Sequence, residues 1–539
     1  MRHGQSFPNS FFSALAPRRG PSAIQNAGRY LPKLFNYEAA DLFSNAVENH
    51  DSCSKLELLV RLSNTLHSNG GLPEEDRGST IKAGYVYLAQ FAVHDMVSSS
   101  VVERLTDLQP AAAQNLETTG LDLSSLYGLQ ENGTVQFFEY DPDSLTRGKF
   151  RIGRLNQNFK PENYLPGPAE DIPRMPFHPV AGCPVGSKRF DPLLADIRNA
   201  DNFILSQLTL LFMKLHNKIY DGLPNNGNRF QLARDLTTAV YLTILEEELL
   251  TALCHPDVVS YYRNISSVDQ LPGDAPSESY ALPVESVFAG LRFGHSMVRM
   301  SYNFNDNFSG FHNNRATLEK LLNLFGLNED AEEHLPTDRR WIIDWSLFFP
   351  TGAGQGQGGA VSKMFNFANK IMPAMSRVLR DHDSVALNLP NGSGLQDANI
   401  GLAFRSLAKG IVFELPTGQA LHRHLAAATG SNNSIVPADA IYEMLMQTAP
   451  FNINSGADKT LETGDAEFLS EHTPLFVYVL AEAAHSHGGN QLGFVGSHLV
   501  CHAFRGAVLT KLQNRPSPNV GTHVQAPLQT MADVIRFVS

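Results

Sequence analysis

The stretch from Gly84 to Met96 most constrains the fold. Its sequence, GYVYLAQFAVHDM, is apolar at nearly every position except Gln90, His94 and Asp95. A run of this length with so few polar residues predicts a helix buried in a core. Residues four positions apart lie on one face of a helix, so Gln90 and His94 are expected to face the same space. A buried histidine is either a satisfied core residue or a reactive group, and this stretch alone supports both readings.

Helical periodicity extends through much of the chain. Apolar residues recur at helical spacing in five segments: 38–65, 81–97, 199–220, 229–253 and 283–300. Residues 129–192 contain short alternating pieces among many Pro and Gly, which predict loops with a minor hairpin. We therefore expect a mainly α fold with few short strands: one large helical domain over residues 36–539, preceded by an N-terminal arm over residues 1–35.

The composition, with 42% hydrophobic and 18% charged residues, fits a globular protein. A net charge of −12 argues against nucleic-acid binding, which needs clustered Lys and Arg. The four cysteines form no C-x-x-C pair, so neither a structural zinc site nor a disulfide framework is expected. We see no apolar run that predicts a transmembrane segment and no secretory signal, and we expect a protein that is cytoplasmic or exported by another route.

Two further segments carry polar groups next to apolar helices. The sequence DIRNADN (196–202) precedes a long helix, and RFGH (292–295) places a second histidine in an apolar helix. A glycine just before that histidine lets a bulky group approach the backbone closely. Two buried histidines on separate helices, with an arginine and no carboxylate-rich cluster, suit a haem better than a free metal ion. One histidine can bind the iron, while the other works with the arginine on the open face.

These motifs resemble those of the animal-type haem peroxidases, the peroxidase-cyclooxygenase superfamily, and are most similar to its bacterial members. The resemblance covers most of the chain from about residue 84 onward and is carried by four motifs in the same order: Gln90-x-x-x-His94-Asp95, Asp196-x-Arg198-x-x-Asp201, His216-Asn217 and Arg292-x-Gly294-His295. It implies an enzyme with haem b that reduces hydrogen peroxide through an oxoferryl intermediate. Its partners would be hydrogen peroxide and a small organic donor or halide; the oligomeric state is left open.

The resemblance implies a role for each residue of the constellation. His94 is the distal histidine, which moves the proton of the peroxide. Arg198 is its distal partner, whose permanent charge stabilises the charge that develops on the peroxide. His295 is the proximal ligand of the haem iron. Gln90 would line the distal cavity where this family binds water or halide, and Arg292 is expected to be a haem-binding residue.

A calcium site is also implied. The segment Thr118-x-Gly120-x-Asp122-x-Ser124 resembles the calcium loop of the family, and Asp95 would complete the site. Oxygen ligands of this kind, from side chains and carbonyls, suit Ca²⁺. The alternative is a polar turn that ends a helix.

The sequence departs from the family at several positions. Val93 stands where mammalian members have an ester-forming acid, so an ester with haem is expected through Asp201 at most. Asn202 stands where myeloperoxidase forms a sulfonium link from methionine, which excludes that link. The asparagine that supports the proximal histidine is replaced by Ser406, with Asn399 as the alternative.

Two other functions stay open. Arg292 stands where the cyclooxygenases and fatty-acid dioxygenases carry a radical tyrosine, which favours a peroxidase, but Tyr302 or another nearby tyrosine could hold a radical. The alternatives are therefore a haem-dependent oxygenase acting on a lipid or specialised metabolite, and a non-catalytic haem-binding scaffold. Outside the site, His216 and Asn217 are expected to brace their helix, and the cluster His422-Arg423-His424 is expected at a helix surface or end.

Overall fold

The computed structural model describes residues 29–50, 54–69, 71–72, 74–98, 108–128, 135–141, 146–154, 170–174, 192–225, 228–274, 280–323, 339–352, 365–381, 385–386, 399–447, 460–514 and 528–539. Residues 1–28 of the predicted arm lie outside this part of the chain. The rest of the arm is anchored, because the backbone N–H of Leu34 donates to both carboxylate oxygens of Glu285, at 3.1 and 3.0 Å.

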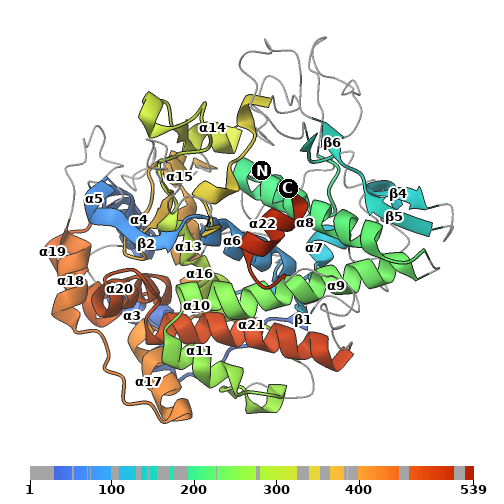
Figure 1. Cartoon of the computed structure of the whole chain (residues 1–539). Helices are drawn as coiled ribbons and strands as arrows, with labels where there is room; N and C mark the ends of the chain where they lie inside the picture. The colour runs from blue at the N-terminus through green and yellow to red at the C-terminus, as the bar shows by residue number, and fades with distance from the viewer. Residues whose placement is uncertain are drawn as a thin grey trace, which may run out of the picture.

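Helices dominate the described residues, which confirms the mainly α fold (Figure 1). The first half of the chain contains α3 (Phe43–Glu48), α4 (Lys55–Asn69), α5 (Glu74–Arg77), α6 (Gly84–Met96), α7 (Ser124–Tyr127), η5 (Ile197–Ala200), α8 (Phe203–Gly222), α9 (Arg229–Thr243), a π-helical turn η6 (Ile244–Leu249), α10 (Leu250–Leu253) and α11 (Pro256–Arg263). The second half contains α12 (Val284–Phe288), η8 (Gly290–Arg292), α13 (Gly294–Met297), α14 (Leu318–Asn323), α15 (Val378–Asp381), α16 (Leu402–Val412), α17 (Gly418–Thr429), α18 (Ala438–Met446), α19 (Thr463–Glu471), α20 (Leu475–His487), α21 (Phe494–Asn514) and α22 (Met531–Val538).

The strands are short and pair two by two, all antiparallel. The pairs in the described chain are β1 (Arg29–Tyr30) with β3 (Gln114–Asn115), β2 (Gly78–Lys82) with β10 (Phe367–Asn369), β4 (Phe138–Asp141) with β5 (Thr146–Phe150), β6 (Gly153–Arg154) with β7 (Glu170–Asp171), β8 (Ser301–Tyr302) with β9 (Ala316–Thr317), and β11 (Val385–Ala386) with β12 (Asn399–Ile400). The pair β4–β5 is the hairpin predicted within residues 129–192.

Helix α6 lies in the middle of the fold and packs against α8, α13 and η5 (Figure 1). Phe91 of α6 stacks on Phe212 of α8 with ring centroids 5.1 Å apart, and Tyr241 of α9 meets Phe91 edge-on at 5.9 Å. All three rings are fully buried. Burial of one such side chain contributes roughly 2 to 3 kcal/mol to stability, so these contacts fix α6 firmly in the core.

Two predicted helices have different boundaries. The helix expected over 81–97 begins at Gly84, because the backbone up to Lys82 pairs with β10. A Cβ on Gly84 would lie 2.6 Å from the carbonyl oxygen of Phe348, so only glycine fits at this start. The helix expected over 283–300 is divided into α12, η8 and α13, because Ala289 leaves helical geometry at φ −131° and ψ −62°.

The pair His216-Asn217 braces α8, as expected. The side chain of Asn217 accepts from the backbone N–H of Phe150 at 2.7 Å and donates to its carbonyl at 2.9 Å. His216 Nδ1 lies 2.9 Å from the hydroxyl of Tyr127. These contacts hold α7 and the β4–β5 hairpin against α8. Among the described residues, no helix has the length and apolar character needed to cross a membrane.

Candidate active site

One face of α6 is partly exposed. Every residue of this helix is buried except Gln90 and Val93, which are partly exposed. His94, 4% exposed, adjoins them. Because residues three or four positions apart share a helix face, buried His94 lies on the same face of α6 as partly exposed Gln90.

Helix α13 lies against α6 and carries His295. A Cβ on Gly294, the residue before His295, would lie 3.9 Å from Cγ1 of Val86. Val86 precedes His94 by eight positions, which is roughly 12 Å along an α-helix. His295, itself partly exposed, therefore lies near the first half of α6, and His94 lies near its end. The two predicted haem-site histidines are thus on two helices that pack together.

The ring of His94 is oriented by an asparagine of η5. His94 Nδ1 lies 3.0 Å from Oδ1 of Asn199, and the Asn199 side-chain nitrogen donates to the carbonyl of Ser125 at 3.4 Å. Since the oxygen of Asn199 can only accept, Nδ1 of a neutral His94 carries the proton and Nε2 carries the lone pair. His94 is therefore in the tautomer that a proton acceptor at Nε2 needs.

Arg198 joins η5 to the end of α6. Its Nη1 donates to the carbonyl of Val97 at 2.6 Å and its Nη2 to the carbonyl of His94 at 2.9 Å. These carbonyls belong to the C-terminal end of α6, which has no intrahelical partners to offer them. The guanidinium also binds Asp196 through Nε, at 3.0 Å from each oxygen. Arg198 thus holds the helix end that carries His94 and places a positive charge beside it.

The electrostatics of this cluster follow from that pair. Burial alone would raise the pKa of Asp196, but the charge and hydrogen bonds of Arg198 hold it below its usual value. Burial would lower the pKa of Arg198, and the carboxylate of Asp196 instead raises it. Glu117 and Asp201 act on the guanidinium in the same direction. Arg198 is therefore permanently charged in this site.

Asn202 begins α8 and contacts Gln90. Its Oδ1 accepts from the backbone N–H of Leu205 at 2.9 Å, which makes it the N-cap of α8, and its Nδ2 donates to Oε1 of Gln90 at 3.2 Å. The position at which a methionine link was considered from the sequence thus has a different role: Asn202 binds a side chain of the site. Asp201, which precedes it, is partly exposed.

The predicted residues on the proximal side are less closely connected. Nε of Arg292 donates to the carbonyl of Val287 at 3.3 Å, so its side chain bends back to the end of α12. Ser406 is buried, and its hydroxyl donates to the carbonyl of Leu402 in its own helix at 3.1 Å. Asn399 lies in β12. Support of His295 by Ser406 or by Asn399 therefore stays a prediction.

The predicted calcium residues come together. The hydroxyl of Thr118 donates to Oδ1 of Asp122 at 3.1 Å, and Gly120 lies between them in the loop. Asp95 accepts from the hydroxyl of Ser124 at 3.3 Å and from two backbone N–H groups, those of Leu123 and Ser125, at 2.9 and 3.0 Å. The loop is tightly wound: Thr119, Leu121 and Leu123 all have positive φ.

Asp95 is fully buried, and burial followed by repulsion from Asp122 raises its pKa to about 7. Two carboxylates that repel each other, one of them fully buried, are costly unless a cation neutralises them. The donor set therefore fits a hard cation. The described chain contains no group of three or more His, Cys, Asp or Glu side chains placed to hold a metal, so hydroxyl and carbonyl oxygens would supply the other ligands here.

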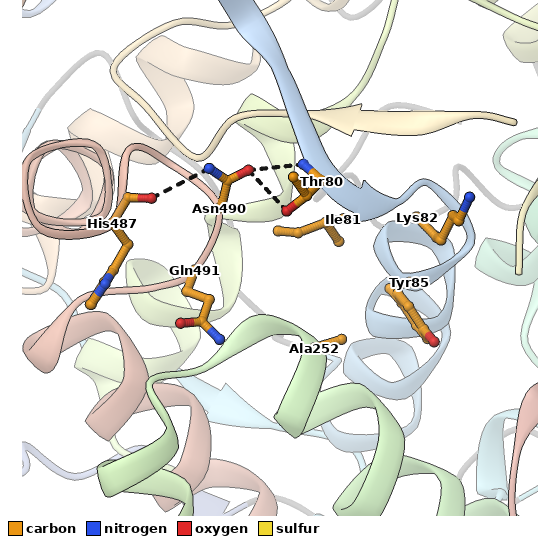
Figure 2. A pocket seen from close by; sticks show the side chains of 8 residues that line it. All are labelled: Thr80, Ile81, Lys82, Tyr85, Ala252, His487, Asn490 and Gln491. Carbon is orange, nitrogen blue, oxygen red and sulfur yellow. Dashed lines mark hydrogen bonds between the residues drawn. The ribbon is translucent and has the colours of Figure 1, made fainter. Parts of the chain in front are cut away.

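A pocket of about 380 Å³ lies elsewhere, and Figure 2 shows Asn490 bridging its two sides. Oδ1 of Asn490 accepts from the backbone N–H of Thr80 at 2.8 Å and from its hydroxyl at 3.2 Å. Lys82 is directed toward the rings of Phe365 and Phe367, 3.8 and 4.1 Å from their centroids. This pocket contains none of the site residues predicted from the sequence; its lining is Thr80, Ile81, Lys82, Tyr85, Ala252, His487, Asn490 and Gln491.

Sequence reasoning missed three polar residues of the site: Asn199, Asn202 as a partner of Gln90, and Glu117. Asn199 and Asn202 flank Asp201 in the DIRNADN segment, and two asparagines next to a charged pair were the available signal. Glu117 Oε1 lies 3.6 Å from Nη2 of Arg198, and its Oε2 accepts from Ser124 at 3.1 Å. No motif indicated this bridge.

Comparison with known proteins gives a consistent result. Residues 82–331 match the family model of the animal haem peroxidase. Peroxidase A from Dictyostelium discoideum superposes with a TM-score of 0.53 at 15% identity, over 95% of this chain and 94% of that chain. Fatty acid alpha-dioxygenases from Oryza sativa (TM-score 0.49, 13% identity, 99% and 89% coverage) and Arabidopsis thaliana (0.46, 12%, 98% and 84%) are also similar. No curated protein matches the chain.

The family match lies over α6, η5, α8 and α13, the elements that carry the site. Residues 82–331 therefore match the animal haem peroxidase family, as the motifs indicated, and the chain shares its fold with Peroxidase A. This is a family of haem-binding oxidoreductases. The exact limits of the domain, expected at residues 36–539, stay a prediction.

Proposed function

We propose that this protein is a haem peroxidase that reduces hydrogen peroxide and oxidises small organic donors or halides. The observation that carries the proposal is the packing of α13 on α6, which brings His295 to the helix of Gln90 and His94. The residues fit a haem: one histidine to bind iron, a second histidine whose Nδ1 faces Asn199, and a fixed positive charge. When bound, haem would supply the iron at which peroxide is reduced.

Each side chain has a definite task in this proposal. His295 would bind the iron. Nε2 of His94 accepts a proton from one peroxide oxygen and returns it to the other, which leaves as water. The guanidinium of Arg198 is held by Asp196 and by the backbone carbonyl of His94. Its positive charge is therefore already in place to stabilise the negative charge that develops on the peroxide. Gln90 borders the same face and would contact the ligand.

The other groups are assigned by the same reasoning. Ca²⁺ would bind Asp95, Thr118, Gly120, Asp122 and Ser124, where it offsets the two carboxylates and keeps the end of α6 in place. Asp201 is the one acid left for an ester with haem. Arg292 would border the haem from η8.

The test is a haem titration followed by an assay of peroxide-dependent oxidation of a phenol and of iodide. Wild type is expected to bind one haem and to oxidise at least one of these donors. His295→Ala should lose haem binding, while the control His216→Gln, at a buried histidine of the core helix α8, should retain it. Haem bound equally well by His295→Ala would contradict the assignment of the iron ligand.

A second candidate, a haem-dependent oxygenase, is favoured by one observation. The hydroxyl of Tyr87 on α6 donates to the hydroxyl of Tyr302 at 3.0 Å, and both rings are buried. Tyr302 follows α13 closely and also accepts from the backbone N–H of Arg299 at 2.9 Å. If the peroxide-oxidised haem removed one electron and one proton from such a phenol, the phenoxyl radical could abstract a hydrogen atom from a lipid and so regenerate the phenol. Under this candidate Tyr302→Phe abolishes oxygenation of a fatty acid; under the peroxidase proposal it leaves donor oxidation intact.

A further inference from the structure

Gln90 and His94 share one face of α6, and each is bound by an asparagine of segment 196–202. Asn199 binds His94 and Asn202 binds Gln90, at 3.0 and 3.2 Å. Gln90 and His94 are four positions apart on the helix, and the asparagines are three positions apart on the facing segment. Two side-chain hydrogen bonds therefore link α6 to the segment that precedes α8.

In each of these hydrogen bonds, a backbone group that can only donate or only accept determines which side chain is the donor. The N–H of Leu205 can only donate, so the Asn202 atom that faces it is oxygen and the other atom is nitrogen. That nitrogen donates to Gln90, so the Gln90 atom that faces it is oxygen, and the Gln90 –NH₂ points away from Asn202. In the same way, the carbonyl of Ser125 can only accept, so oxygen of Asn199 faces His94 and Nδ1 carries the proton.

We propose that Asn199 and Asn202 are positioning residues that fix the hydrogen-bond polarity of the site, so that His94 offers an acceptor at Nε2 and Gln90 offers the donors of its –NH₂. This inference rests on the proposed function and deepens it. The pair suits a ligand that donates from one atom and accepts at a neighbouring atom, as hydrogen peroxide does, and it favours small anions near Gln90 over cations. Neither asparagine needs to touch the ligand.

The direction of the hydrogen bond between Asn202 and Gln90 can be reversed by replacing one atom, the side-chain nitrogen of Asn202. Asn202→Asp keeps the N-cap of α8, because a carboxylate oxygen still accepts from Leu205. Its other oxygen can only accept, so the Gln90 amide must turn its –NH₂ toward residue 202 and its carbonyl toward the ligand. Asn202→Ser keeps the N-cap without adding a charge and removes the hydrogen bond to Gln90. Asn366→Asp is the matched control, since Asn366 is also buried and bonds backbone groups on both sides, those of Asn303.

The first readout is the affinity of the ferric, haem-loaded full chain for fluoride, measured from the Soret band. Loss of a hydrogen bond to an anion is worth at least about tenfold in affinity, so Asn202→Asp should weaken fluoride binding about tenfold or more and Asn202→Ser by a smaller factor. Asn366→Asp should leave it unchanged. If Asn202→Ser binds fluoride as wild type does, any effect of Asn202→Asp is one of charge, and the proposal for Asn202 is overturned.

The second readout is the tautomer of His94, taken from ¹⁵N shifts of the full chain labelled at histidine, with His94→Gln to assign the signals. Wild type should show a protonated Nδ1. Asn199→Asp keeps an acceptor and should retain this tautomer, whereas Asn199→Leu should shift His94 toward the Nε2–H form. An unchanged tautomer in Asn199→Leu overturns the proposal for Asn199. This arm is run without haem, so it decides the inference even if wild type takes up no haem and the peroxidase proposal itself fails.

Discussion

Nη2 of Arg198 lies 3.6 Å from Oε1 of Glu117, and this contact joins the reactive end of α6 to the loop proposed to bind Ca²⁺. Glu117 also accepts from the hydroxyl of Ser124, and Ser124 contacts Asp95, the neighbour of His94. The arginine, the loop and the end of α6 are thus one polar cluster. A change in the loop should therefore be felt at the haem side of α6.

Removal of Ca²⁺ is expected to lower stability. Without the cation, the buried carboxylate of Asp95 and the partly exposed carboxylate of Asp122 repel each other. A ligand at a hundred times its dissociation constant stabilises a protein by about 2.7 kcal/mol, so chelation should lower the melting temperature by several degrees, and added Ca²⁺ should restore it. The measurement is thermal unfolding with chelator, with Ca²⁺ and with Mg²⁺. Equal melting temperatures in all three would exclude the calcium site.

Arg198→Ala is expected to destabilise the fold as well as the site. The variant leaves Asp196, whose side chain is only 12% exposed, without its cation, and it frees two carbonyls at the end of α6. Removing one partner of a buried ion pair costs about 3 to 5 kcal/mol. The measurement is denaturant unfolding of Arg198→Ala, Asp196→Asn and the double variant. If the double variant is as unstable as the sum of the single variants, the two residues are not coupled.

The sequence predicted the parts of this site that depend on local pattern. An apolar run with Gln90 and His94 four positions apart defined the central helix, because helical periodicity is a local property. The boundary at Gly84 was missed, since it depends on pairing of β2 with β10, far away in the chain. His422 was expected at a helix surface or end, but it is buried between the hydroxyl of Tyr478 and the carbonyl of Asn433. Hydrogen-bond partners from distant segments cannot be predicted from the periodicity of a local sequence.

The same limit applies to the bridging residues. Asn199 reads as one of several polar residues before a helix, and only the fold brings it to His94. Arg198 was expected to face the peroxide, whereas most of its donors bind Asp196 and the carbonyls of α6. Its proposed stabilisation of the peroxide therefore depends on its positive charge more than on a hydrogen bond that it donates to the peroxide.

Acid is expected to destabilise the protein through buried histidines such as His67. Burial, helped by the charge of Arg380, lowers the pKa of His67 from 6.5 to about 4. Below pH 6.5 the unfolded chain binds a proton that the folded protein excludes until about pH 4, so the free energy of unfolding falls as the pH falls through this window. Over this window, His67 alone should lower the free energy of unfolding by about 3 kcal/mol.

Denaturant unfolding at pH 7 and pH 4.5 checks this expectation. His67→Asn can still donate to the carbonyl of Ser376, which His67 contacts at 3.2 Å, but it does not titrate. The variant should therefore lose less stability than wild type between the two pH values. An equal loss in both proteins would show that His67 does not contribute.

Any covalent attachment of haem is expected to depend on Asp201 alone. Val93 cannot form an ester, and Asn202 is bound to Gln90. After several turnovers with peroxide, haem that resists extraction by acidified organic solvent should be found in wild type and not in Asp201→Asn. Resistant haem in the Asp201→Asn variant would mean that another residue forms the link.

The most direct test of the central claim is stopped-flow absorbance of haem-loaded protein mixed with stoichiometric hydrogen peroxide, with His94→Leu alongside. Because His94 is proposed to move the peroxide proton, wild type should change its Soret band rapidly and His94→Leu should do so about 10² to 10⁴ times more slowly. A Soret band that hardly changes in haem-loaded wild type, or that changes equally fast in both proteins, would contradict the peroxidase account.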